Sequence, residues 1–244
     1  MGRRVVSFCV YGSHPRYLQG ALQNASGLPV YYPGWEGRFY CAASTDPSIL
    51  SGLRDLGASV VVMPDPDIVR APDEGMFWRF LTADEGLDAC VFRDTDSRFS
   101  DREAAAVDAW ILSGRRAHIM RDHPDHRVPI LGGMWGVRGS LTGLRAAIAE
   151  YVAGRSVGRG EDQRFLETWV YPRVAVDALA HDEVVWPTSS IPFPVPRRGS
   201  EFVGLRYDEL DRPFPGDLAS MQRYLPSVSW RRPAGLLGLP GEPR

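Results

Sequence analysis

The stretch Ala89-Cys90-Val91-Phe92-Arg93-Asp94-Thr95-Asp96-Ser97-Arg98 indicates the architecture of this 244-residue chain, because a short apolar run ends in two carboxylates one residue apart. Apolar runs of this length are typical of strands that are buried on both faces of a parallel sheet. We therefore expect strands at residues 5–11, 38–42, 59–63, 89–93, 117–120 and 129–137.

Segments with helical periodicity lie between these runs. We expect helices at residues 17–24, 47–56, 75–83, 101–113, 141–153 and 163–174. The alternation predicts an α/β fold in which a mostly parallel sheet carries helices on both sides. After Trp186 the sequence is rich in Pro, Gly and Arg and loses its periodicity, so residues 187–244 are expected to form a loop or an irregular wrapped tail.

Composition excludes several classes of function. The formal charge of −2 gives no general attraction for nucleic acid, and the absence of Lys excludes Schiff-base chemistry. Cys9, Cys41 and Cys90 lack the spacing of metal ligands and are expected to be buried, reduced thiols. No apolar stretch approaches the ~18 residues that span a membrane, so a cytoplasmic protein is expected, and a peripheral membrane contact stays compatible with the sequence.

The Asp94-Thr95-Asp96 triplet is the strongest chemical signal. Ligands of open α/β sheets collect at the carboxyl ends of strands, where this pair falls. Carboxylates bind Mg²⁺ or Mn²⁺ and leave coordination positions that diphosphate oxygens can fill. A solvated turn after a strand would give the same pattern. Haloacid-dehalogenase phosphatases are disfavoured because Arg98 stands where they need Thr or Val, whereas nucleotidyltransferases remain an alternative.

Two other polar positions stand out. Arg79 lies alone among apolar residues, so its charge needs a partner: the carboxylates of the triplet, a phosphate or another acidic side chain. His123 lies in the dense polar stretch 120–127 between two expected strands. This stretch indicates either acceptor recognition or a solvated loop, and its spacing does not match a tight metal motif.

In the order of its motifs, the chain resembles the GT-A glycosyltransferases of bacterial type across about residues 4 to 185. The matching features are Tyr11-Gly12, Asp94-Thr95-Asp96, Pro129-Ile130-Leu131-Gly132-Gly133-Met134-Trp135-Gly136, Gly160-Glu161-Asp162-Gln163 and His181-Asp182. The resemblance implies a Rossmann-like mixed sheet in a single catalytic domain, residues 1–186. Residues 1–100 would bind the nucleotide sugar, residues 101–186 would bind the acceptor, and residues 187–244 would pack on the site or close over it.

The resemblance also implies roles for single residues on the donor side. Tyr11 and Gly12 would lie beside the base or ribose of the donor, and Arg79 and Thr95 would join them. Asp94 and Asp96 would be the DXD pair that holds Mn²⁺ or Mg²⁺, with Asp96 the more direct metal ligand. His181 would complete the metal shell, although a structural His is about as common beside an apolar run.

On the acceptor side, Gly132 and Gly133 would let the backbone approach the acceptor or the transferred sugar, together with Met134, Trp135 and His123. A tight turn is the alternative for the two glycines. Glu161 and Asp162 would be catalytic. Asp162 would act as a base in an inverting enzyme or contact the sugar in a retaining one, and helix capping is the alternative.

The sequence thus predicts transfer of a sugar from a nucleotide-diphosphate sugar, first a UDP-sugar, to an acceptor hydroxyl. A noncatalytic nucleotide-sugar or carbohydrate-binding module is the second hypothesis, and a sugar-phosphate nucleotidyltransferase is the third. In the tail, residues 192–199 would either close over the donor diphosphate or form a linker.

Overall fold

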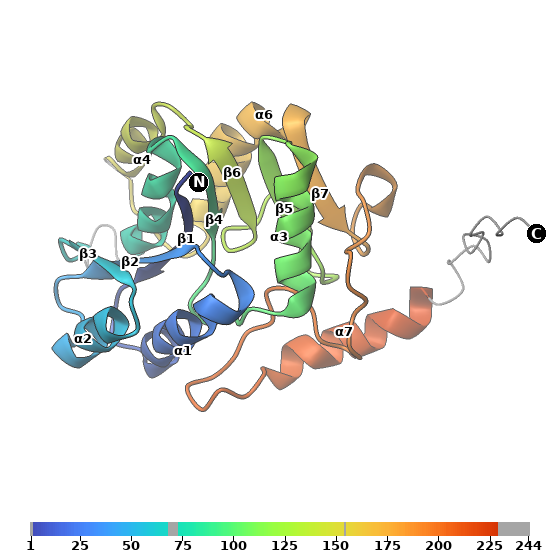
Figure 1. Ribbon diagram of the computed structural model, residues 1–244, viewed down its shortest axis with the longest axis horizontal. Coiled ribbons are helices and arrows are strands. Elements are labelled where there is room, and N and C mark those ends of the chain that lie inside the picture. Colours follow the sequence, from blue (N-terminus) through green and yellow to red (C-terminus); the bar gives the residue numbers. More distant parts are fainter. Residues whose placement is uncertain (1, 68–72, 154, 229–244) are drawn as a thin grey trace, which may run out of the picture.

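The computed structural model describes residues 2–67, 73–153 and 155–228 and contains a seven-stranded sheet with helices on both faces (Figure 1). The strands are β1 (Arg4–Val10), β2 (Glu36–Ala42), β3 (Ser59–Met63), β4 (Leu87–Phe92), β5 (Ala117–Arg121), β6 (Trp135–Gly139) and β7 (Ala178–Asp182). The α-helices are α1 (Pro15–Tyr31), α2 (Pro47–Asp55), α3 (Asp101–Ser113), α4 (Leu144–Val152), α5 (Glu161–Phe165), α6 (Tyr171–Val174) and α7 (Pro215–Val228). Three 3₁₀-helices are η1 (Glu74–Asp84), η3 (Ala175–Asp177) and η4 (Pro187–Ser189), and η2 (Leu166–Val170) is a π-helix.

The strand order is β3-β2-β1-β4-β6-β5-β7. Strands β1 to β4 pair in parallel, β5 pairs in parallel with β7, and β6 runs antiparallel between β4 and β5. The expected mixed α/β sheet is therefore confirmed. No helix among the described residues is long and apolar enough to cross a membrane.

The pleat of β1 divides the core into two layers. Val5 and Cys9 face the layer that contains η1, α4 and α5, whereas Val6, Phe8 and Val10 face the layer of α1, α2 and α3. Because successive side chains of a strand point to opposite faces, a strand buried on both faces is apolar throughout. All three cysteines are buried free thiols, as expected.

Three segments differ from the expectations. Residues 129–134 form a turn, in which the Met134 amide donates to the Leu131 carbonyl, so β6 starts only at Trp135. β7 was not expected. In the tail, residues 190–214 are irregular apart from isolated bridges, but residues 215–228 form α7, because Leu218 and Met221 pack against Phe202 and Leu205.

Two histidines form a buried pair between β5, β7 and α3. His118 Nε2 lies 2.8 Å from His181 Nδ1, and Trp110 of α3 stacks on His118 with 11° between the rings. Both imidazoles are fully buried. Burial lowers the pKa of His118 well below its usual value, and it lowers the pKa of His181 to about 4. The pair is therefore neutral at neutral pH.

We predict that lowering the pH from 7 to 5 destabilises the protein. The pKa of His181 falls from its usual 6.5 to about 4 on folding, so the stability is fully present above pH 6.5 and is lost as the pH falls toward 4. Each such histidine changes the free energy of unfolding by up to about 1.4 kcal/mol per pH unit. Urea unfolding at the two pH values measures this change.

His118→Phe should flatten this pH dependence, because Phe keeps the stack on Trp110 but does not titrate. His14→Gln is the matched control, since that ring is exposed at the start of α1. An unchanged pH dependence in His118→Phe would contradict the assignment.

Candidate functional site

A pocket of about 590 Å³ opens at the carboxyl ends of β1 and β4. Because these strands are parallel, the segments that follow them meet at one edge of the sheet. The volume lies within the range of small-molecule sites. The lining residues include Cys9, Tyr11, Gly12, Ser13, His14, Tyr17, Ser44, Asp65, Asp73, Arg79, Asp94, Thr95, Asp96, Arg159, Asp162 and Arg206.

Arg79 joins two carboxylates at the base of this pocket. Its Nη1 donates to Asp94 Oδ1 at 2.5 Å, and its Nη2 donates to Asp162 Oδ2 at 2.9 Å. Arg79 is 5% exposed, so the guanidinium is held out of water and needs both partners. The structure thus brings Arg79, Asp94 and Asp162 together although they are distant in the sequence.

Asp162 is held from two sides. Besides Arg79, the amide of Gln163 donates to its Oδ1 at 2.8 Å. Burial raises the pKa of this carboxyl, and the charge of Arg79 opposes that effect. Glu161 does not line the pocket; Tyr151 Oη donates to it at 2.8 Å. Of the two predicted catalytic residues, only Asp162 reaches the pocket.

Gly132 and Gly133 form the wall behind this ion triad. A Cβ on Gly133 would lie 2.0 Å from Asp94 Oδ2, and a Cβ on Gly132 would lie 2.6 Å from Arg79 Nη2. Gln163 ties this turn down, because its Oε1 accepts from the Gly132 amide and its Nε2 donates to the Ile130 carbonyl. The backbone therefore makes room for protein side chains, rather than for the acceptor or sugar that the sequence suggested.

Asp96 lines the same pocket. Arg16 Nε is 3.5 Å from its Oδ2, and the Tyr207 amide donates to its carbonyl at 2.7 Å. Burial and the charge of Asp94 raise the pKa of Asp96 to about 6, while Arg16 and Arg206 oppose the rise. Asp94 and Asp96 both line the pocket, and a cation between them would stabilise the charges of both carboxylates.

The predicted metal ion would have the carboxylates of Asp94 and Asp96 as its protein ligands. The described residues contain no group of three or more His, Cys, Asp or Glu that could hold an ion. Asp94 and Asp96 both line the pocket, and the Asp94 side chain is 47% exposed. Mg²⁺ commonly binds one or two carboxylates, with water and substrate phosphate as its other ligands. The pair fits an ion of that kind and does not form an all-protein cage.

Tyr11 and Gly12 follow β1 and line the pocket as predicted for a strand end. The Tyr11 ring packs so closely on Gly75 that a Cβ there would lie 2.5 Å from it. Thr95 also lines the pocket, and its carbonyl accepts from Asn24 and Arg98. These contacts fix the backbone of the Asp94–Asp96 turn against α1.

Other predicted residues lie elsewhere. His181 is buried against His118 on β7 and does not line the pocket, so its assignment as a ligand beside Asp94 and Asp96 is wrong. Met134 and Trp135 belong to the apolar core. His123 packs against Phe202 and does not line the pocket. All four side chains are occupied by packing, which explains why none reaches the pocket.

The sequence analysis missed several lining residues. Ser44 and Asp65 follow β2 and β3, and the rule of strand ends would have found them. Arg159 precedes α5. Arg206 comes from the tail, where the sequence has no periodicity and gives no signal. The Ser44 amide donates to Asp65 Oδ1 at 2.8 Å, so these two loop ends are joined.

We predict that Gly133→Ala lowers the free energy of unfolding by about 1–3 kcal/mol, because the new methyl group displaces Asp94 from Arg79. Gly158→Ala is the control, since a Cβ there meets nothing within 4 Å. Urea denaturation of both variants measures the difference. Equal stabilities would show that the turn relaxes freely and does not hold Asp94.

No protein-family model and no curated protein matches the chain. Solved structures that overlap it include glucosyl-3-phosphoglycerate synthase from Mycobacterium tuberculosis in complex with Mn²⁺, UDP and phosphoglyceric acid. That overlap has a TM-score of 0.45 and 16% identity and covers 73% of this chain and 67% of that one.

A second overlap is with mannosyl-3-phosphoglycerate synthase from Rubrobacter xylanophilus, with TM-score 0.48, 12% identity and coverage of 94% of this chain and 74% of that one. A third is with 4-diphosphocytidyl-2C-methyl-D-erythritol synthase from Anaerococcus prevotii, with TM-score 0.43, 12% identity and coverage of 92% and 98%. The chain spans about half, 53%, of a mycobacterial protein that it also overlaps, with TM-score 0.35. Overlaps with TM-scores below 0.5 do not establish a function.

Proposed function

We propose that the protein is a metal-dependent glycosyltransferase that moves a sugar from a nucleotide-diphosphate sugar, first a UDP-sugar, to an acceptor hydroxyl. The observation that supports this proposal is the meeting of Asp94, Asp96 and Asp162 in one pocket at the carboxyl ends of β1 and β4. Carboxylates that are close together in a partly dry site repel one another unless a cation or a proton lies between them. Arg79 meets this requirement between Asp94 and Asp162, and a bound ion with an anionic substrate would meet it between Asp94 and Asp96.

Asp94 and Asp96 would hold Mn²⁺ or Mg²⁺. When bound, the ion supplies charge neutralisation for the nucleoside diphosphate that leaves. Arg79 fixes the orientation of Asp94 through the 2.5 Å contact, so this carboxylate needs little reorganisation on binding. Arg16 of α1 forms a looser ion pair with Asp96, at 3.5 Å and without a hydrogen bond.

The nucleoside would lie over the ends of β1, β2 and β3. Tyr11 has an aromatic ring for stacking, and Gly12 has no side chain to cover the backbone. Ser44 and Asp65 have a hydroxyl and a carboxylate for hydrogen bonds. Burial raises the pKa of Tyr11, which keeps its hydroxyl protonated as a hydrogen-bond donor. This arrangement combines an aromatic surface with few polar groups, as is usual in ligand sites.

Asp162 would act on the transferred sugar or the acceptor. It shares the guanidinium of Arg79 with Asp94, which supports a role at the reacting end of the donor. As a base it would take the proton of the acceptor hydroxyl, and as a sugar ligand it would orient the donor. The anomeric configuration of the product separates these two roles.

We predict that, with Mn²⁺ and a panel of UDP-, GDP- and TDP-sugars, the protein releases free nucleoside diphosphate from at least one donor. Asp96→Asn should lower that rate by at least about 100-fold, because it removes a ligand of the group that stabilises the leaving charge. Asp88→Asn is the control, since Asp88 lies on β4, the strand that leads to Asp96, but outside the pocket and in an ion pair with Arg4.

Three outcomes would reject this function. Equal turnover by Asp96→Asn and the parent would exclude the assigned ion site. Donor binding without consumption would favour the binding module. Release of pyrophosphate from a nucleoside triphosphate and a sugar phosphate would favour the nucleotidyltransferase.

A further inference from the structure

The C-terminal strap, defined as residues 195–217, contributes Arg206 to the pocket although it lies outside the sheet. Most of it has no regular structure, and it runs past α3 into α7 (Figure 1). A segment of this kind loses much conformational entropy when one arrangement is selected. Several contacts with the rest of the fold fix it, and one fully buried carboxylate is the fixed point for two of its residues.

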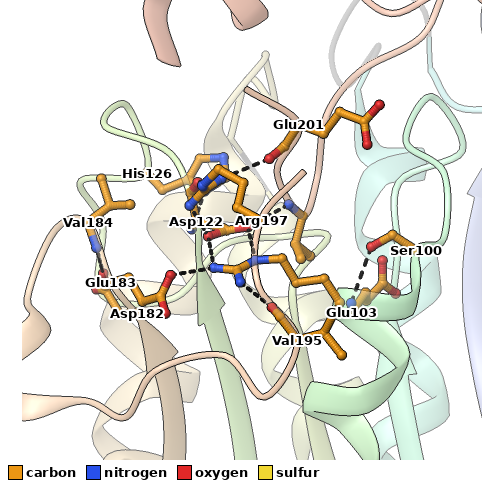
Figure 2. Close-up of polar contacts among 12 residues, drawn as sticks. Ser100, Glu103, Asp122, His126, Asp182, Glu183, Val184, Val195, Arg197 and Glu201 are labelled. Carbon is orange, nitrogen blue, oxygen red and sulfur yellow. Dashed lines mark hydrogen bonds and ion pairs between the residues drawn. The ribbon is translucent and has the colours of Figure 1, made fainter. Parts of the chain in front are cut away.

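Asp122, directly after β5, is that point (Figure 2). It is fully buried and accepts hydrogen bonds from three residues. Arg102 of α3 donates to both of its oxygens at 2.9 Å, and Arg197 Nη2 donates at 2.5 Å. The amide of Val203 donates to Oδ2 at 2.9 Å. One carboxylate thus joins α3 to two points of the strap.

The two arginines extend this anchor. Arg102 Nη1 donates to the Val195 carbonyl at 2.5 Å, and its Nη2 also donates to Glu183 at 2.7 Å. Arg197 Nη1 donates to the Glu201 carbonyl at 3.0 Å. Two guanidiniums therefore face two carboxylates, and the strap is held at residues 195, 197, 201 and 203. Because the charges are buried and balanced, removing one leaves its partners uncompensated.

The strap reaches the pocket three residues after Val203. The Tyr207 amide donates to the Asp96 carbonyl at 2.7 Å, which places Arg206 at the Asp94–Asp96 turn. Asp217 of α7 accepts from Arg206 Nε at 2.9 Å and from Nη2 at 2.6 Å. The guanidinium lies over the Phe214 ring, 5.3 Å from its centroid. Arg206 is thus held in one position beside Asp96.

We propose that Asp122 is a positioning residue of the pocket, which anchors the strap so that Arg206 stands beside Asp96 and contacts the anionic part of the substrate. The proposal rests on the proposed function, because it assumes that a diphosphate binds at Asp94 and Asp96. A guanidinium that is already held in position binds an anion more tightly, because no conformational entropy of the strap is lost on binding. Asp122 acts only through the strap, since it does not line the pocket.

Calorimetric titration with UDP in the presence of Mn²⁺ tests the proposal. Arg206→Gln should weaken binding about tenfold, the loss expected for one charge-assisted hydrogen bond. Asp122→Asn keeps the side-chain shape but loses the charge that holds Arg102 and Arg197, and it should weaken binding by about the same factor. In a background of Arg206→Gln, Asp122→Asn should cause little further loss, because Arg206 is the only route of its effect.

Asp182→Asn is the matched control for lost stability. Asp182 is almost equally buried, is the last residue of the neighbouring strand β7 and pairs with Arg121 at 2.7 Å. Its carboxylate accepts from the amides of residues 184–186, so it also anchors a segment, but it does not line the pocket. It should lower the melting temperature as Asp122→Asn does while leaving the affinity for UDP and Mn²⁺ unchanged.

The outcomes separate this proposal from the proposed function. If the parent binds none of UDP, GDP and TDP with Mn²⁺, both fail. If the parent binds and Asp122→Asn keeps its affinity, or Asp182→Asn loses as much, only the positioning role fails. Equal losses from Asp122→Asn with and without Arg206 would also overturn it, because the effect would then travel by another route.

Discussion

The buried guanidinium of Arg79 is the constraint on which the pocket depends. A charge that is 5% exposed cannot lie alone in the interior, so the chain must bring carboxylates to it. Asp94 arrives from the end of β4 and Asp162 from the start of α5, and both meet the same fork. The backbone at Gly132 and Gly133 closes the space behind them. Four segments thus converge because one cation needs neutralising.

A second buried ion cluster, formed by Asp122, Arg102 and Arg197, fixes the C-terminal strap. At Asp122 a buried carboxylate gathers guanidiniums, whereas at Arg79 a buried guanidinium gathers carboxylates. The first cluster arranges the walls of the pocket, and the second attaches an irregular segment to them. A chain without Lys is suited to this, because planar Arg forks can bind two acceptors at once.

Sequence patterns predicted the parallel half of the sheet and the position of Asp94 and Asp96, because buried strands and strand ends have local signals. They also identified Arg79 as a charge in need of a partner. His181 was misplaced because β7 was not recognised: in that strand His181 shares a face with Leu179, which packs toward the core of α1 and α3. Arg206 had no local signal, because its place depends on contacts between distant segments: the hydrogen bonds of Val203 to Asp122 and of Tyr207 to Asp96, and its own ion pair with Asp217.

The reversed direction of β6 has a consequence for how this protein can vary. In a parallel strand only the segment that follows it reaches the ligand edge, but β6 pairs Trp135 with Phe92 at that edge, so the segment before it arrives there. The loop between Asp122 and Ile130 can therefore change in length without shifting the register of β1 to β4, as long as Asp122 and the Gly132–Gly133 turn keep their contacts. Variation in that loop would change the surface beside the pocket while the strands that present Tyr11, Asp94 and Asp96 stay as they are.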